Sequence, residues 1–181
     1  MSAQLSKVTV TVVAGNMSYV TKQPAEYWIE HLKLVEHPGD EDGFFNVLFE
    51  DSFCVRGMMD EERSAASIAY FLQKRADYVN PDTMFFKCQS TEMIYYHHGD
   101  PLTIYLLPEC GGELEKVVLG LDVAHGEVLA YAVPKNRWFT RLVESCDKDA
   151  YTLFSCSLAP GFDQKDFEAE TLETIRREYL K

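Results

Sequence analysis

Side chains that can transfer protons are concentrated between residues 90 and 101, in the segment STEMIYYHHGDP. The segment holds one glutamate, Glu92, together with Tyr95, Tyr96, His97 and His98. A carboxylate placed among apolar side chains loses hydration and becomes a better proton acceptor, and a nearby imidazole or phenol can return the proton. We therefore predict Glu92 as a general base, with His97 and Tyr95 as candidate acids. The alternative is a buried glutamate that only accepts hydrogen bonds, beside tyrosines that only fill the core.

Three other side chains are candidates for contact with a bound molecule: Arg63, Cys88 and Trp138. Arg63 is expected either to clamp a carboxylate or to form a surface ion pair. Cys88 is expected to be an inert buried thiol, because Lys87 points to the opposite face of a strand and cannot activate it. Trp138 is expected to pack in the core or to stack on a ligand ring. The sequence contains neither the Gly-x-Ser-x-Gly motif of a hydrolase nor a Cys-x-x-Cys motif.

Composition narrows the classes of partner. The chain has 181 residues, 46% of them hydrophobic, which is enough for one well-packed domain. Its formal net charge of −12 disfavours binding to nucleic acid or to anionic membrane surfaces. The apolar run VTVTVVAG from Val8 alternates as a strand does, unlike a signal peptide, and no run reaches the roughly 18 residues of a membrane span. We expect a cytoplasmic protein whose partner is a small molecule or a second copy of itself.

Short runs of β-branched and aromatic residues predict nine strands with no helix between them, which is typical of a sandwich or barrel. A helix is predicted from Pro24, with a stripe that reaches Val35, and the segment HPGDEDG at residues 37–43 is predicted to be a loop. A second helix is predicted in residues 163–181, with Phe167 and Tyr179 on its apolar face. The nine predicted strands begin at Phe44, Ser67, Thr83, Met93, Leu102, Lys116, Glu127, Arg137 and Tyr151.

The chain resembles the small, single-domain RmlC-like cupins, a branch of the cupin superfamily whose function is largely unassigned. The resemblance is carried by HPGDEDGFF, RSAASIAYFL, STEMIYYHHGDPLTIYLL, LGLDVAHGEVLAYAVPKNRW and YTLFSCSLAPGFDQKDFE, which follow one another in the order of the family. It implies an all-β fold, the cupin double-stranded β-helix or jelly roll, with a flanking helix at each end. It further implies one domain over residues 1–181, with a core at about 25–168, a barrel that binds a small organic ligand, and a homodimer.

The same resemblance bears on metal binding. Metal-bearing cupins carry two histidines one residue apart, a glutamate, a glycine seven positions later, and a further histidine in a second motif. Here Phe86 and Cys88 stand at the first two histidine positions, Glu92 and Gly99 are retained, and Phe139 stands at the last. A glutamate and one thiol are too few for a zinc or iron site, so we expect no metal cofactor. Phe86, Cys88 and Phe139 are instead expected to line the ligand pocket.

The chain also departs from its own branch. Relatives commonly have an arginine where this chain has Asn46, a histidine where it has Tyr95, and Trp-His-Arg at residues 85–87. These changes exchange charge and imidazole for aromatic and amide groups, so we expect a ligand less polar than those of the relatives. Asn46 is expected to contact that ligand.

The two adjacent histidines cannot both be placed inside by a regular strand, because neighbouring side chains point to opposite faces. A regular strand from Glu92 would direct His98 inward, whereas the resemblance favours His97, and a β-bulge would reconcile the two.

Three functions are open from the sequence. The leading hypothesis is a metal-independent cupin that binds a small organic molecule in an aromatic-lined barrel and isomerises, epimerises or cyclises it with Glu92 as base. The second is a binding or carrier protein without chemistry. The third is a structural dimer whose barrel is filled by its own aromatic side chains.

Overall fold

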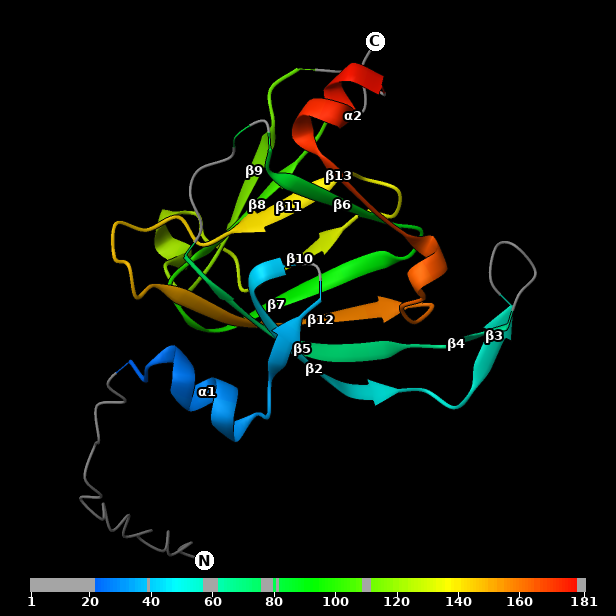
Figure 1. Ribbon diagram of the computed structural model, residues 1–181, viewed down its shortest axis with the longest axis horizontal. Coiled ribbons are helices and arrows are strands. Elements are labelled where there is room, and N and C mark those ends of the chain that lie inside the picture. The colour runs from blue at the N-terminus through cyan, green and yellow to red at the C-terminus, as the bar shows by residue number, and fades with distance from the viewer. Residues whose placement is uncertain are drawn as a thin grey trace, which may run out of the picture.

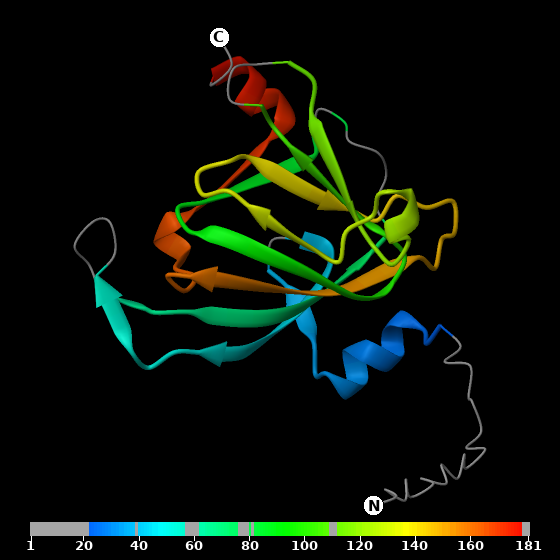
Figure 2. The same ribbon diagram turned by 180° about the vertical axis from the view of Figure 1, so that it is seen from behind.

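Two antiparallel β-sheets face each other and form the body of the molecule (Figures 1 and 2). The computed structural model describes residues 22–38, 40–56, 62–75, 80, 82–108 and 112–178, without the side chains of residues 40–42. From edge to edge, the six-stranded sheet contains β1 (Val35–His37), β2 (Asp40–Glu50), β5 (Ser67–Lys74), β12 (Tyr151–Ala159), β7 (Thr91–Gly99) and β10 (Ala130–Val133). The five-stranded sheet contains β13 (Phe167–Thr171), β6 (Met84–Cys88), β11 (Phe139–Leu142), β8 (Leu102–Leu106) and β9 (Glu115–Leu119).

The smaller elements lie around these sheets. Strands β3 (Cys54–Arg56) and β4 (Glu62–Ser64) pair with each other and extend beyond β2 and β5 (Figure 1). The helices are α1 (Ala25–His31) and α2 (Leu172–Glu178), and two 3₁₀ turns are η1 (Val123–His125) and η2 (Gln164–Asp166). Strands distant in the sequence, such as β5, β12 and β7, are neighbours in one sheet, as jelly rolls require. The predicted all-β jelly roll with two flanking helices is therefore confirmed, although the two sheets do not close into one barrel.

The main hydrophobic core lies between the sheets because each strand alternates inward and outward side chains. The six-stranded sheet contributes Ile94, Phe154 and Cys156, and the five-stranded sheet contributes Ile104 and Phe139, all at most 2% exposed. This cluster fills only part of the space between the sheets.

Each helix covers the outer face of one sheet. Helix α1 packs Ala25 against Leu72 of β5 and Leu153 of β12, on the face opposite the main core. Helix α2 packs Leu172 and Ile175 in a separate cluster at the five-stranded sheet. Among the described residues, no helix has both the length and the apolar composition that a membrane crossing requires.

All nine predicted strands are present, but both predicted helices are too long. Helix α1 ends at His31 and is followed by Lys33 with φ of 53°, after which Val35 enters strand β1 and is 59% exposed. The predicted loop at residues 37–43 is wrong in part, because Asp40 already belongs to β2 and pairs with His37. Phe167 belongs to β13, not to a helix, because FEAET alternates along β6. Tyr179 and the run from Val8 lie outside the described residues.

Replacing Gly99 by alanine is expected to destabilise the fold strongly. Gly99 ends β7 with φ of 102°, and an added Cβ would lie 2.1 Å from the backbone oxygen of Tyr151. Gly126 is a matched control, since its φ is 98° but nothing lies within 4 Å of the added atom. Urea unfolding should show a loss of about 1–3 kcal/mol for backbone strain in each variant, with a further loss only in Gly99→Ala. Equal losses in both variants would contradict the close approach to Tyr151.

Candidate functional site

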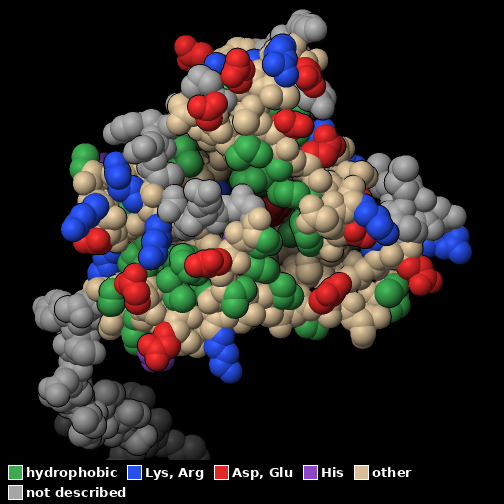
Figure 3. Space-filling model, viewed as in Figure 1, with side chains coloured by type: hydrophobic (Ala, Val, Ile, Leu, Met, Phe, Trp, Pro, Cys, Tyr) green, Lys and Arg blue, Asp and Glu red, His purple; other side chains and the backbone are tan. Residues whose placement is uncertain are grey.

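A cavity of about 290 Å³ lies between the two sheets, beside the main core. Its wall is mainly aromatic and aliphatic, and Figure 3 shows hydrophobic side chains gathered around a hollow on one face of the molecule. The aromatic side chains that line it are Phe45, Phe71, Phe86, Phe162 and Phe167. Because this volume is open although both sheets supply large side chains, the space between the sheets is not filled by aromatic residues of the protein.

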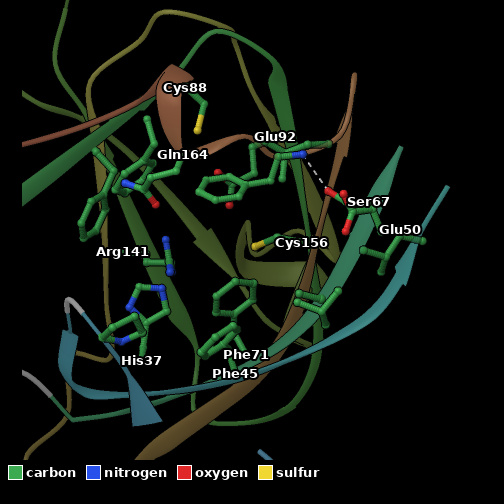
Figure 4. A pocket seen from close by; sticks show the side chains of 18 residues that line it. His37, Phe45, Glu50, Ser67, Phe71, Cys88, Glu92, Arg141, Cys156 and Gln164 are labelled. Carbon is green, nitrogen blue, oxygen red and sulfur yellow. Dashed lines mark hydrogen bonds between the residues drawn. The ribbon is translucent and has the colours of Figure 1, made fainter. Parts of the chain in front are cut away.

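A small set of polar side chains interrupts this apolar wall (Figure 4). Glu92 reaches the cavity from β7 and is only 8% exposed, whereas Arg141 reaches it from β11 in the opposing sheet. Ser67 accepts a hydrogen bond of 2.9 Å from the backbone N–H of Phe162, which ties β5 to the segment that covers the cavity. His37 and Gln164 also line the wall.

Strand periodicity explains why the two charged side chains point inward. Glu92 stands two positions before Ile94, a fully buried core residue of the same strand, so both share one face. Arg141 stands two positions after Phe139, which is 1% exposed. The fold therefore presents a carboxylate and a guanidinium to the same cavity from opposite sides.

Two thiols lie beside the carboxylate. Burial, followed by the negative charge of Glu92, raises the pKa of Cys88 to about 12. The same two causes raise the pKa of Cys156 well above its ordinary value. Both thiols are therefore protonated at neutral pH and are poor nucleophiles, as the sequence predicts for Cys88.

Arg141 is held by aromatic rings. The central carbon of its guanidinium lies 5.2 Å from the ring centre of Phe71, 5.6 Å from that of Phe86 and 5.2 Å from that of Phe154. Such cation–π contacts attract the positive charge of the guanidinium to the faces of the rings. Its Nε is buried without a hydrogen-bond partner.

Comparison with known proteins identifies the family. Residues 26–170 match the model of the Cupin superfamily (DUF985), which covers most of the chain. This protein is a cupin. No protein of curated function matches the chain.

Solved structures of similar proteins support the same fold for this cupin. A protein from Shewanella oneidensis is 34% identical, with a TM-score of 0.70, and the match covers 87% of this chain and 90% of the other. A hypothetical protein from Leishmania major is 29% identical, with a TM-score of 0.72, and the match covers 87% and 93%. The Streptomyces nucleoside dehydratase Pac13 is 14% identical, with a TM-score of 0.46 over 76% and 83% of the chains, which is too distant to carry an argument.

The described side chains of this cupin do not form a recognisable metal site. No group of three or more histidine, cysteine, aspartate or glutamate side chains among the described residues is arranged to hold one. Phe86 and Phe139 occupy two of the family's ligand positions and contact each other with ring centres 6.3 Å apart. The potential donors that line the cavity are Glu92, Glu50, His37 and two protonated thiols, and no three of them are arranged as the ligands of a zinc or iron site.

Neither histidine of the pair enters the cavity, so the expectation that one of them does is wrong. His97 contacts Ser155 at 2.8 Å, and His98 contacts the Tyr151 hydroxyl at 3.0 Å and the ring of Trp28 in α1. A β-bulge is the reason: the register between β7 and β12 shifts so that Leu153 pairs with His98 and Phe154 with Tyr96. The bulge places both imidazoles on the outer face of the six-stranded sheet.

Tyr95 and Asn46 also lie outside the cavity. Tyr95 is 37% exposed, with its hydroxyl 3.5 Å from Ser157, on the outer face with His97. Asn46 donates a hydrogen bond of 2.9 Å to the backbone oxygen of Leu32 and so anchors the chain that follows α1. Neither residue lines the cavity. Tyr95 is therefore not placed to act as the predicted acid, and Asn46 is not placed to contact the ligand as predicted.

Three further residues that were predicted to contact the ligand have structural roles instead. Arg63 is 7% exposed and donates to Asp166 and to the backbone oxygen of Gly161, so it forms a buried ion pair away from the cavity. Trp138 is 8% exposed and packs in the cluster with α2. Phe139 packs in the main core and reaches the cavity only through its contact with Phe86. Glu92, Phe86 and Cys88 are the predicted residues that do line the cavity.

Sequence reasoning missed Arg141 and several cavity phenylalanines. Arg141 could have been found, because its spacing from Phe139 places a charge on an inward strand face. The position of Phe167 in the cavity could not be predicted from the sequence, because it depends on the pairing of β13 with β6. In that pairing Phe167 lies opposite Cys88.

The two outer histidines are expected to make stability depend on pH. Burial lowers the pKa of His97, and burial together with Lys22 lowers the pKa of His98. At a pH below about 6.5, the histidine pKa in an unfolded chain, the unfolded protein therefore binds more protons than the folded protein. The free energy of unfolding should fall as the pH is lowered below that value. His97→Gln keeps a group that can bond to Ser155 but does not titrate. Urea unfolding at pH 7.5 and 5.5 should show a smaller loss for this variant than for the wild type, and an identical loss would contradict the assignment.

Proposed function

We propose that this cupin binds a small, largely apolar organic molecule in the cavity without a metal ion, and that Glu92 moves a proton on that molecule. The observation that supports this most is a nearly buried carboxylate in an open cavity walled by phenylalanine. Small-molecule sites in proteins combine an apolar wall with a few placed polar groups, and they begin at roughly 300 Å³.

The chemistry proposed for Glu92 is redox-neutral. Its carboxylate removes a proton from a carbon next to a carbonyl group, and the electron pair of the broken C–H bond moves onto that carbonyl. Return of the proton to another atom gives isomerisation, and its return to the same atom after the intermediate has turned over gives epimerisation. In cyclisation the carbanion instead attacks a second carbonyl carbon of the same molecule, and the oxygen of that carbonyl takes up the electron pair and the proton. Because Tyr95 and His97 lie outside the cavity, Glu92 itself is the proposed donor in the return step.

A carrier protein is the second candidate function. It is favoured by the loss of the expected acids from the cavity and by a wall that is mostly hydrocarbon. A carrier would bind the same class of molecule and release it unchanged.

The proposal is tested by analysing freshly purified protein for organic molecules and metals together. Mass spectrometry of a solvent extract should show one organic compound in stoichiometric amount, and elemental analysis should show no stoichiometric metal. Ala69→Phe is the control variant, since Ala69 lines the cavity and the added ring would occupy the open space. The extracted compound should be absent from that variant. Stoichiometric metal in the wild type, lost on substitution of Glu92, would overturn the metal-free proposal.

A further inference from the structure

Arg141 is the one lysine or arginine that lines the cavity within the described part of the chain. Three rings surround its guanidinium, those of Phe71, Phe86 and Phe154. A guanidinium placed among apolar rings loses much of its hydration, and a buried charge is costly unless it is paired.

The ring contacts do not satisfy the edges of this guanidinium. Aromatic faces attract the cation, whereas its N–H bonds point outward in the guanidinium plane and require oxygen acceptors. The Arg141 Nε is buried without a partner, and no hydrogen bond or ion pair joins the side chain to any described residue. The Nε of the buried Arg63 is also without a partner, but the other nitrogens of Arg63 donate to Asp166 and to the backbone oxygen of Gly161. Arg141 therefore resembles half of an ion pair whose acidic half is not part of the described protein.

We infer that the missing half is the carboxylate of the bound molecule, so that the ligands of this cavity are monoanionic organic acids with an apolar body. This inference rests on the proposed function and names its ligand class. A carboxylate is planar and offers two oxygens, which matches the two-pronged N–H edge of a guanidinium. The phenylalanine wall then holds the rest of the acid.

The charges of the cavity favour one negative charge over two. The lining contains a single guanidinium, and its carboxylates Glu92 and Glu50 would repel a phosphate dianion. Phosphate sites usually add a second cation, and no second lysine or arginine lines this wall among the described residues. Arg141 belongs to β11 and Glu92 to β7 of the opposing sheet. An acid whose carboxylate binds Arg141 would therefore extend its carbon chain toward Glu92.

The inference is tested with matched pairs of probes that differ in charge only. Phenylacetate is compared with phenylacetamide, and hexanoate with hexanamide, by isothermal titration calorimetry. In the wild type each acid should bind about 10- to 100-fold more tightly than its amide, because a charged partner for Arg141 is gained. In Arg141→Met, which retains an unbranched apolar stem against the rings, this acid preference should fall to about one. Arg177→Met, on the exposed end of α2, is the control and should retain the preference.

A second readout separates binding from a structural role of Arg141. Arg141 is half-buried, with its Nε fully buried and unpartnered, so removing it should raise the melting temperature of the ligand-free protein, whereas loss of a structural arginine would lower it. Acid preference that disappears together with a higher melting temperature supports the inference.

The failures of the two proposals are distinguishable. Acids and amides that bind equally well to the wild type would overturn the acid inference but retain the cavity as a site for apolar molecules. Binding by neither member of both pairs would overturn the inference and the proposed function together. A lower melting temperature of Arg141→Met with unchanged acid preference would assign Arg141 a structural role and overturn the inference.

Discussion

Glu92→Gln is expected to abolish proton transfer to and from the bound molecule while the cavity retains its affinity within a few-fold. Glutamine has the shape of glutamate but cannot take up a proton at neutral pH. Loss of a general base lowers rates by about 10²–10⁴-fold. Incubation of the protein with its extracted ligand in D₂O should show, by NMR, deuterium entering a carbon position with the wild type and not with the variant.

Glu173→Gln provides the matched control for this experiment, because Glu173 is an exposed carboxylate on α2 that does not line the cavity. Deuterium incorporation should be unchanged in that variant. Incorporation at the wild-type rate in Glu92→Gln would remove the role assigned to Glu92. If the wild type binds the ligand without any incorporation, the carrier function is the correct one.

Asp166→Ala is expected to lower the free energy of unfolding by about 3–5 kcal/mol, because it leaves the Arg63 charge buried and uncompensated. Asp166 and Arg63 are 9% and 7% exposed, and together they join η2 to β4. Urea unfolding followed by circular dichroism measures this loss directly.

A double variant distinguishes the effect of leaving one charge uncompensated from the effect of lost packing around Asp166. Arg63→Met combined with Asp166→Leu replaces both charges with apolar groups, so it should recover most of the stability lost in Asp166→Ala. A double variant that is less stable than Asp166→Ala would show that packing, and not the uncompensated charge, determines the effect.

The fold was largely predictable because strand signals are local. Alternating β-branched and aromatic runs predict nine of the eleven strands in the two sheets. Phe167 is predicted in a helix instead, because its strand, β13, forms only through pairing with β6. The helix that was extended to Val35 ends early because Lys33 takes a left-handed conformation, which no residue type at that position announces. The homodimer, the cytoplasmic location and the single domain over residues 1–181 stay predictions.

The site was predictable in part. Glu92, Phe86 and Cys88 were placed correctly by family positions and strand alternation. His97 and Tyr95 were not, because a bulge between β7 and β12 changes which side chains face inward, and a bulge depends on the partner strand. The combination of Glu92 and Arg141 could not be predicted from one strand, since it requires two sheets to face each other.

A crystal structure of the protein grown in excess phenylacetate is the most direct test of the central claim, that the cavity binds a small organic molecule between Glu92 and Arg141. The account predicts density for the acid, with its carboxylate on the Arg141 guanidinium and its ring against Phe71 and Phe86. A cavity that holds only ordered water, or that is closed by the phenylalanine side chains, would contradict it.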